Sequence, residues 1–270
     1  VPTTWDEVNA AAEKLQAAGI IPFAHGGQAW QDATVFEAVA MGIGGNNYYK
    51  NCYVDLKETC LRSETTVKVF DQMRKLQGFT DEGSPGRDWN VATGMVIEGK
   101  AGFQIMGDWA KGEFTAAGKV PGVDYYCSPT PSNNGYLYNV DSFIFYKTSD
   151  PDKQEGQKLL AKLMMGKNFQ KVFNLYKGSI PARLDVSMDE FDKCAKTSNS
   201  DIKTAGAGGG LVPSFAHGMA QGNTMKAALQ DVITEHFNSD MSSVDAANAL
   251  ADSVLAVSYT HLRAHETCHN

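Results

Sequence analysis

The sequence predicts an α/β fold, and two neighbouring signals at its start carry that prediction. Thr4 and Glu7 have the spacing of a capping box at the beginning of a helix. The apolar residues that follow at helical spacing are Trp5, Val8, Ala12 and Leu15. Gly19 ends this pattern, and residues 20–24 then predict a short buried strand. A helix followed at once by a buried strand is typical of α/β architectures.

The next part of the chain alternates between predicted helices and polar connections. The helices expected here are residues 31–41, 65–76 and 88–98. Residues 46–62 are polar and rich in tyrosine, and they predict a surface loop or hairpin. A short buried strand is expected from Gly102 to Met106, and it breaks at Gly107 just before a helix begins.

The second half of the chain continues the same alternation. Residues 138–141 predict the end of a strand, and residues 142–146 predict a further buried strand. Asp150 followed by Pro151 predicts the start of a helix. The helices expected from there are residues 152–165, 168–176, 188–195, 223–237 and 244–256. The glycine-rich residues 205–210 match no phosphate-binding motif and predict a loop.

Composition limits the class of function. Of the 270 residues, 43% are hydrophobic and 20% charged, which is ordinary for a globular protein of one large or two small domains. The net charge of -7 argues against nucleic acid as a partner, because phosphate binding needs a basic surface. No apolar run approaches the ~18 residues that cross a bilayer. The chain starts at Val1 without a secretory signal region, so we expect a mature or truncated sequence.

Two of the five cysteines lie close together in the sequence. Cys52 and Cys60 flank a short segment and could close a small disulfide loop in an oxidising compartment. The same spacing is equally compatible with two separate thiols. No cysteine pair has the CxxC spacing of a zinc or redox site.

The last thirteen residues, 258–270, are expected to be a non-native tail. They follow a helix that is complete at Val257, and they resemble translated adaptor sequence. Within them, residues 265–269 formally match the zinc motif HExxH. The chain ends one residue later, so a third ligand downstream is impossible, and we predict no metal site and no cofactor.

Hydrolytic chemistry has weak support. The sequence has no GxSxG nucleophile elbow. Asp108 and Asp141 are candidates for the paired carboxylates of a glycoside hydrolase, because the separation that such a pair needs is spatial. Asp108 also stands at a helix start, where a carboxylate binds backbone N–H groups, and we favour this structural role.

Trp109, Asn139 and Asp141 are the main candidates for ligand binding. A lone tryptophan usually belongs to a core, but Trp109 follows a strand break, where ligands bind in open α/β sheets. Asn139 and Asp141 are two residues apart at a predicted strand end, so we expect them to face one side. A flat aromatic surface with a paired amide and carboxylate suits a polyhydroxylated ring.

Three further residues have a structural and a functional interpretation. Lys177 stands at a helix end, where it complements the helix dipole or donates to a ligand. His217 is either a satisfied buried histidine or a ligand contact, and Trp30 is either core or part of the site. Together these residues predict a site rich in hydrogen-bond donors.

Five motifs, in order, resemble bacterial extracellular solute-binding proteins of ABC sugar importers. They are Thr-Thr-Trp-Asp-Glu at 3–7, Met-Gly-Asp-Trp-Ala at 106–110, Tyr-Asn-Val-Asp at 138–141, Tyr-Lys-Gly-Ser-Ile-Pro at 176–181 and Pro-Ser-Phe-Ala-His-Gly at 213–218. The last two motifs sharpen the resemblance to the glucose/mannose-binding branch. It covers the chain from Val1 to about Val257.

The resemblance implies a periplasmic-binding-protein-like type II fold whose two lobes close on a monosaccharide, without catalysis. It implies that Trp109 stacks on the sugar. It also implies hydrogen bonds to sugar hydroxyls from Asn139, Asp141, Lys177 and His217, with lysine and histidine as donors. The expected partners are a monosaccharide and a membrane permease, and the expected state is a monomer in the periplasm or anchored outside the cell.

One departure from the family affects the domain prediction. Family members carry a further N-terminal region that builds most of the first lobe, and we expect that this chain lacks it. Residues 1–141 and 186–257 would form the second lobe, and residues 142–185 would cross over to the first lobe. This arrangement predicts some exposed apolar surface.

Overall fold

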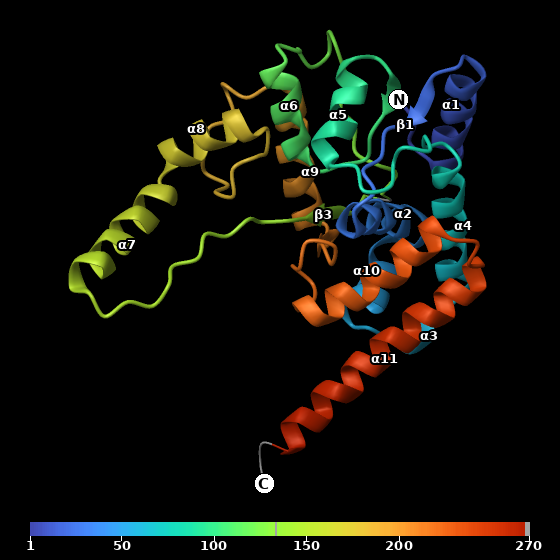
Figure 1. The fold of residues 1–270 in the computed structure, drawn as a ribbon. Coiled ribbons are helices and arrows are strands. Elements are labelled where there is room, and N and C mark those ends of the chain that lie inside the picture. The colour runs from blue at the N-terminus through green and yellow to red at the C-terminus, as the bar shows by residue number, and fades with distance from the viewer. Residues whose placement is uncertain (133, 268–270) are drawn as a thin grey trace. The chain divides into compact units, whose positions relative to one another are not determined.

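The computed structural model describes residues 1–132 and 134–267, with the backbone alone described from residue 260 onward (Figure 1). The chain divides into two compact units. Unit 1 contains Val1–Met106, Ser128–Asn139 and Ile202–Asn270, and unit 2 contains Gly107–Cys127 and Val140–Asp201. Among the described residues, no helix has both the length and the apolar character needed to span a membrane.

Unit 1 contains most of the regular structure. Its helices are α1 (Trp5–Ala17), α2 (Ala29–Tyr49), the π-helix η1 (Lys50–Val54), α3 (Glu58–Leu61), α4 (Glu64–Gln77), α5 (Trp89–Ile97), α10 (Asn223–Asn238) and α11 (Ser243–Thr267). Its strands are β1 (Ile21–Phe23), β2 (Ala101–Phe103), β3 (Tyr136–Tyr138) and β4 (Leu211–Pro213). The strands form two parallel pairs, with Phe23 opposite Phe103 in one and Tyr138 opposite Pro213 in the other.

The core of unit 1 forms between α2, α4, α10 and α11. Helix α10 packs against both α2 and α11 (Figure 1). Phe36, Tyr53, Phe70 and Phe215 are among its largest fully buried side chains. Phe36 contacts the other three rings at centroid distances of 4.9 to 6.2 Å. Because aromatic side chains bury a large apolar area, this cluster supplies much of the driving force for folding.

Unit 2 contains shorter and more exposed elements. They are the 3-10 helix η2 (Asp108–Ala110), α6 (Lys111–Ala116), α7 (Pro151–Met164), α8 (Lys167–Lys177) and α9 (Lys193–Ala207), whose last turns belong to unit 1. Every side chain of α7 is at least partly exposed. A small cluster of Val186, Phe191 and Ala195 forms the apolar centre of this unit.

Most helices agree with the sequence prediction to within a few residues. The capping box at Thr4 and Glu7 is present at the start of α1, and Asp150 caps α7 with Pro151 in its first turn. Gly178 ends α8 in the left-handed conformation, with φ of 91°. These signals are local, so they survive in the folded protein.

The prediction of a surface loop at residues 46–62 is wrong. Most of this segment is helical, because α2 continues to Tyr49, η1 follows it directly, and α3 begins after residues 55–57. Tyr49, Cys52 and Tyr53 are fully buried. The two buried tyrosine hydroxyls have partners inside the protein: that of Tyr53 lies 3.0 Å from the Tyr48 hydroxyl, and that of Tyr49 donates to Glu37 at 3.1 Å. Tyrosine therefore acts here as a core residue with a paired hydroxyl.

The prediction of a buried strand at residues 142–146 is also wrong. No strand is assigned to these described residues, and Ile144 and Tyr146 are each 80% exposed. The strand before them ends at Tyr138, so Asn139 and Asp141 both lie beyond its last residue. Asn139 belongs to unit 1 and Asp141 to unit 2, and the alternation of a strand does not govern their directions.

Three helix boundaries also differ from prediction. The helix expected at 188–195 begins only at Lys193, because the Asp192 carboxylate accepts from the Ala195 N–H at 2.8 Å and caps α9 there. Helix α9 continues into the expected 205–210 loop and ends at Ala207. Helix α11 continues past its expected end to Thr267, through residues such as Leu262, Ala264 and Glu266 that favour helix.

Candidate binding site

The carboxyl ends of β3 and β4 place Asn139 beside the loop that carries His217. Tyr138 and Pro213 are opposite each other at the ends of these parallel strands, and the Ser214 N–H extends the ladder by donating to the Tyr138 carbonyl at 3.0 Å. Residues 139 and 214 therefore leave the same edge. In α/β folds, this edge is where ligands bind.

The side chain of Ser214 stabilises the loop from Ser214 to His217. The Ser214 Oγ accepts from the His217 N–H at 3.1 Å and lies 2.8 Å from its Nδ1. These two contacts hold the imidazole close to its own backbone. The His217 side chain is 15% exposed, and its Nε2 atom is buried.

Glu37 of α2 lies behind this loop, and the sequence prediction did not include it. Its carboxylate accepts from the Ser214 hydroxyl at 2.7 Å, the Ala216 N–H at 3.2 Å and the Tyr49 hydroxyl at 3.1 Å. The residue is only 3% exposed. A signal was available, because Glu37 interrupts the apolar face of the predicted helix at 31–41, and a buried carboxylate needs partners.

Trp30 and His217 lie together in unit 1. Their ring centroids are 6.1 Å apart, and the planes meet edge to face at 68°. The Trp30 indole N–H donates to Gln28 Oε1 at 2.8 Å, which fixes the direction of the half-buried ring. The pair thus places an indole beside an imidazole whose Nε2 atom is buried.

Asp108 of unit 2 binds a backbone N–H, but not one at the start of its own helix, because η2 has no side-chain cap. Its carboxylate accepts from the Ile180 N–H at 3.1 Å and ties η2 to the turn that follows α8. Burial raises the pKa of Asp108, although the hydrogen bond from Ile180 and the nearby Lys111 act in the opposite direction. The side chain is therefore committed to backbone and is poorly placed to face a ligand.

Trp109 follows Asp108 in η2 and is half-buried. Its six-membered ring folds back over Gly107, and a Cβ added at Gly107 would overlap that ring. The backbone of Gly107, with φ of -68° and ψ of 165°, would suit any residue. Glycine is needed at this position for space, and its absence of a side chain sets where the indole lies.

Lys177 and Asp141 form an ion pair in unit 2. Lys177 is the last residue of α8, and its Nζ also lies 5.8 Å from the centre of the Phe173 ring. The lysine side chain is 28% exposed and the aspartate 61% exposed. Water competes for both groups, so the pair adds little stability.

The predicted residues thus fall into two sets. The set in unit 1 is Trp30, Asn139 and His217, and the set in unit 2 is Asp108, Trp109, Asp141 and Lys177. The structure brings together Trp30 with His217, and Asp141 with Lys177. The expected pairing of Asn139 with Asp141 on one strand face is wrong, since both lie past the strand end.

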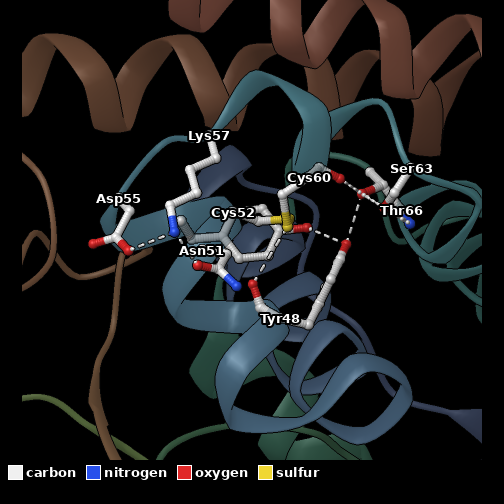
Figure 2. Close-up of a disulfide and its surroundings, with 9 residues drawn as sticks. Tyr48, Asn51, Cys52, Asp55, Lys57, Cys60, Ser63 and Thr66 are labelled. Atoms are coloured by element: carbon white, nitrogen blue, oxygen red, sulfur yellow. Dashed lines mark hydrogen bonds and ion pairs between the residues drawn. A yellow bond between two sulfur atoms is a disulfide. The ribbon is translucent and has the colours of Figure 1, made fainter.

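Two disulfides link the described cysteines. Cys52 and Cys60 are bonded across the junction of η1 and α3, where Thr66 and Tyr48 also meet (Figure 2). Cys127 and Cys194 are bonded within unit 2, and the sequence analysis did not predict this pair. A signal existed, because four cysteines remain when Cys268 in the expected tail is set apart.

Among the residues whose side chains are described, no cluster of three or more histidine, cysteine, aspartate or glutamate side chains could hold a metal ion. The HExxH match at 265–269 lies outside those residues.

Comparison with known proteins adds to this geometry. The chain is 46% identical over 256 residues to a probable sugar-binding periplasmic protein of Brucella suis biovar 1 (strain 1330) and 44% identical over 256 residues to one of Rhizobium meliloti (strain 1021). Each alignment covers 94% of this chain, and 60% and 61% of those proteins. The chain thus spans about three fifths of the length of these relatives.

Solved structures share the fold. A chitin oligosaccharide binding protein matches with a TM-score of 0.74 and 17% identity over 93% of this chain and 64% of its own. The bacterial solute receptor AcbH matches with a TM-score of 0.68 and 16% identity over 95% of this chain and 66% of its own. The predicted fold class, a helix-rich α/β fold of the periplasmic-binding-protein type, is confirmed. Residues 2–164 match the family model described as bacterial extracellular solute-binding protein, and the chain belongs to this family.

Proposed function

We propose that this chain belongs to the sugar-binding component of an ABC importer and binds a monosaccharide of the glucose or mannose type. The observation that carries the proposal is the pairing of Trp30 with the partly exposed ring of His217 at 6.1 Å. An aromatic face covers the C–H side of a sugar ring, and an adjacent polar atom binds a hydroxyl. The curated relatives, which are named sugar-binding periplasmic proteins, support the same class of ligand.

The second set of residues has matching chemistry. We assign Trp109 as a stacking surface, Asp141 as an acceptor for hydroxyl protons and Lys177 as a donor. The ion pair between Asp141 and Lys177 supports this assignment, because it keeps an acceptor and a donor side by side. Asn139 and His217 would hydrogen-bond further hydroxyls at the carboxyl ends of β3 and β4.

Location and partners follow from the same proposal. The names of the relatives support a periplasmic site of action, with delivery of the sugar to a membrane permease by a monomeric binding protein. For the lobes, we retain the predicted division into 1–141 with 186–257, and 142–185 as a crossover to the other lobe. The exposed apolar residues of the crossover, such as Phe143, Ile144 and Leu163, support this division.

The test is a titration of the full chain with D-glucose, D-mannose and D-galactose at concentrations up to millimolar. Tryptophan fluorescence is the signal that reports binding. We expect a saturable change, lost in Asp141→Ala and altered in amplitude in Trp109→Phe. Asp152→Ala, which removes an exposed carboxylate of α7 in the same unit, is the matched control. A flat response to all three sugars would contradict the monosaccharide assignment.

The same samples test the hydrolase alternative that uses Asp108 and Asp141. A buried carboxyl with a raised pKa, such as Asp108, is a feature of general acids. A binding protein leaves a chromogenic glycoside intact over hours. Release of the chromophore that disappears in Asp141→Ala would replace the binding proposal by the enzymatic one.

A further inference from the structure

Hydrogen bonds in unit 1 run from the buried carboxylate of Glu37 through the hydroxyl of Ser214 to the ring of His217. We propose that Glu37 is a positioning residue that keeps a proton on Nδ1 of His217, so that Nε2 of the neutral ring accepts a hydrogen bond from a sugar hydroxyl. The proposal rests on the function proposed above. It also replaces the expectation that His217 acts as a donor.

The hydroxyl of Ser214 decides the direction of these bonds. A serine hydroxyl has one proton to donate and two lone pairs to accept with. Its partners are the Glu37 carboxylate at 2.7 Å, the His217 N–H at 3.1 Å and the His217 Nδ1 at 2.8 Å. A carboxylate only accepts and a backbone N–H only donates. The single proton therefore goes to Glu37, and the remaining lone pair of Ser214 requires a proton on Nδ1.

Glu37 is itself held firmly. Its second oxygen accepts from the Ala216 N–H at 3.2 Å and from the Tyr49 hydroxyl at 3.1 Å. The Tyr49 hydroxyl in turn accepts from the Phe215 N–H at 3.1 Å. The carboxylate thus receives bonds from one backbone N–H and two hydroxyl groups, and these fix its orientation. A proton placed on Nδ1 leaves Nε2 of a neutral imidazole as an acceptor.

Substitution of Glu37 by glutamine makes a sharp prediction. The Ala216 N–H can only donate, so the amide oxygen must stay opposite it, and the amide NH2 must then face Ser214. The serine now accepts from glutamine and from the His217 N–H, and its own proton turns to Nδ1. The ring proton moves to Nε2. One nearly isosteric change therefore reverses the donor and acceptor roles of the imidazole.

The first test needs no sugar. The ring nitrogen signals of His217 are recorded by NMR on the full chain at about pH 8, where an ordinary histidine is neutral. We expect the Nδ1–H form in the wild type, the Nε2–H form in Glu37→Gln and a mixture in Ser214→Ala, which removes the link. Glu64→Gln, at an exposed position that starts α4, should leave the signals unchanged. The Nε2–H form in the wild type would overturn the proposal.

The second test uses D-glucose analogues in which one hydroxyl at a time is replaced by fluorine, which cannot donate. In the wild type, one analogue should bind roughly tenfold more weakly than glucose, as for the loss of one hydrogen bond, and this loss should vanish in His217→Ala. In Glu37→Gln the same analogue should lose less. An equal loss in the wild type and Glu37→Gln would contradict the acceptor role.

The two tests separate two kinds of failure. If no monosaccharide binds the wild type while the Nδ1–H form is present, the proposed function fails and the positioning of the ring stands. If sugar binds but the ring has the other tautomer, the binding function stands and the role of Glu37 falls. Circular dichroism on each variant checks that Glu37→Gln and Ser214→Ala are folded.

Discussion

The two units of this protein differ in the interactions that stabilise each of them internally. Unit 1 buries a large aromatic and aliphatic cluster, in which Phe36, Tyr53 and Phe215 are fully inaccessible. Unit 2 has a small apolar centre and exposes residues such as Leu159 and Leu163. Unit 1 is therefore stabilised by packing spread over many residues, whereas unit 2 depends on a few specific interactions between side chains.

The links of unit 2 are identifiable. Lys111, which is nearly buried, pairs with Asp192 at 2.7 Å, and the Phe114 and Tyr125 rings stack at a centroid distance of 4.1 Å. The Cys127–Cys194 disulfide joins the two chain segments of the unit. The ion pair and the disulfide each connect segments that are distant in sequence, so the loss of either should loosen a large part of unit 2.

A large loss of stability is expected from truncating the core of unit 1. Phe36→Ala should lower the free energy of unfolding by about 3–5 kcal/mol, because it removes a buried ring and leaves a cavity. Leu163→Ala, at a side chain that is 60% exposed in unit 2, should change it by less than about 0.5 kcal/mol. Urea denaturation measures both. Equal losses would contradict the contrast between the units.

For the two disulfides we expect the opposite order, with a larger loss of stability on removing the one in unit 2 than the one in unit 1. Their cysteines are 67 residues apart in unit 2 and 8 apart in unit 1. Loop-closure entropy assigns about 4.5 kcal/mol to the longer loop and about 2.5 kcal/mol to the shorter one. Thermal melting should therefore show a larger loss for Cys127→Ala with Cys194→Ala than for Cys52→Ala with Cys60→Ala. The reverse order would show that unit 2 does not rely on its link.

A buried histidine makes unit 1 sensitive to acid. Burial and the nearby Arg74 lower the pKa of His236 from its usual 6.5 to about 4. Between these values the unfolded chain binds more protons than the folded one. The contribution of neutral His236 to the free energy of unfolding is fully present above about pH 6.5. As the pH falls towards 4, the free energy of unfolding decreases by about 3 kcal/mol. His236→Phe should remove this part of the pH dependence, measured by urea denaturation at several pH values.

If wild type and His236→Phe lose stability in parallel between pH 6.5 and 4, other groups account for the acid sensitivity. The ring of His236 packs edge-on against Phe70 at 4.8 Å, so phenylalanine is a conservative replacement. A variant that is less stable at every pH by a constant amount would report a packing change and not a titration.

Substitution of two glycines of unit 2 should have the smallest effects. One glycine leaves room for a neighbouring side chain, and the other only adds backbone freedom within a helix. Gly107→Ala should displace the Trp109 ring and shift its fluorescence, because a Cβ at Gly107 would overlap the indole. Gly156→Ala, within α7, meets no neighbouring atom and should stabilise the helix by about 0.5–1 kcal/mol. A fluorescence spectrum unchanged by Gly107→Ala would refute the close contact between this glycine and Trp109.

The sequence predicted the elements whose signals are local. The capping box of α1, the Asp-Pro start of α7 and the glycine end of α8 each specify a boundary within one helical turn. Residues 46–62 could not be predicted in this way. Their burial depends on tertiary hydrogen bonds such as that from the Phe215 N–H to the Tyr49 hydroxyl, which forms only when distant parts of the chain meet.

The candidate site shows the same limit. The family resemblance selected Asp141, Lys177 and His217, and the structure adds that two of these form an ion pair. Glu37 was missed because its partners, Ser214 and Ala216, are more than 170 residues away in the sequence. Buried polar networks are tertiary features, and a lone polar residue on an apolar helix face is the only local sign of them.

Hydrogen exchange of the full chain, with and without D-glucose, tests the central claim of sugar binding most directly. The account predicts that saturating glucose slows amide exchange at residues 107–110 and 177–180 of unit 2 and at residues 214–218 of unit 1. Exchange in α1 and α4, which carry no predicted contact, should stay the same. Unchanged exchange at all these loops with glucose, mannose and galactose would contradict the account.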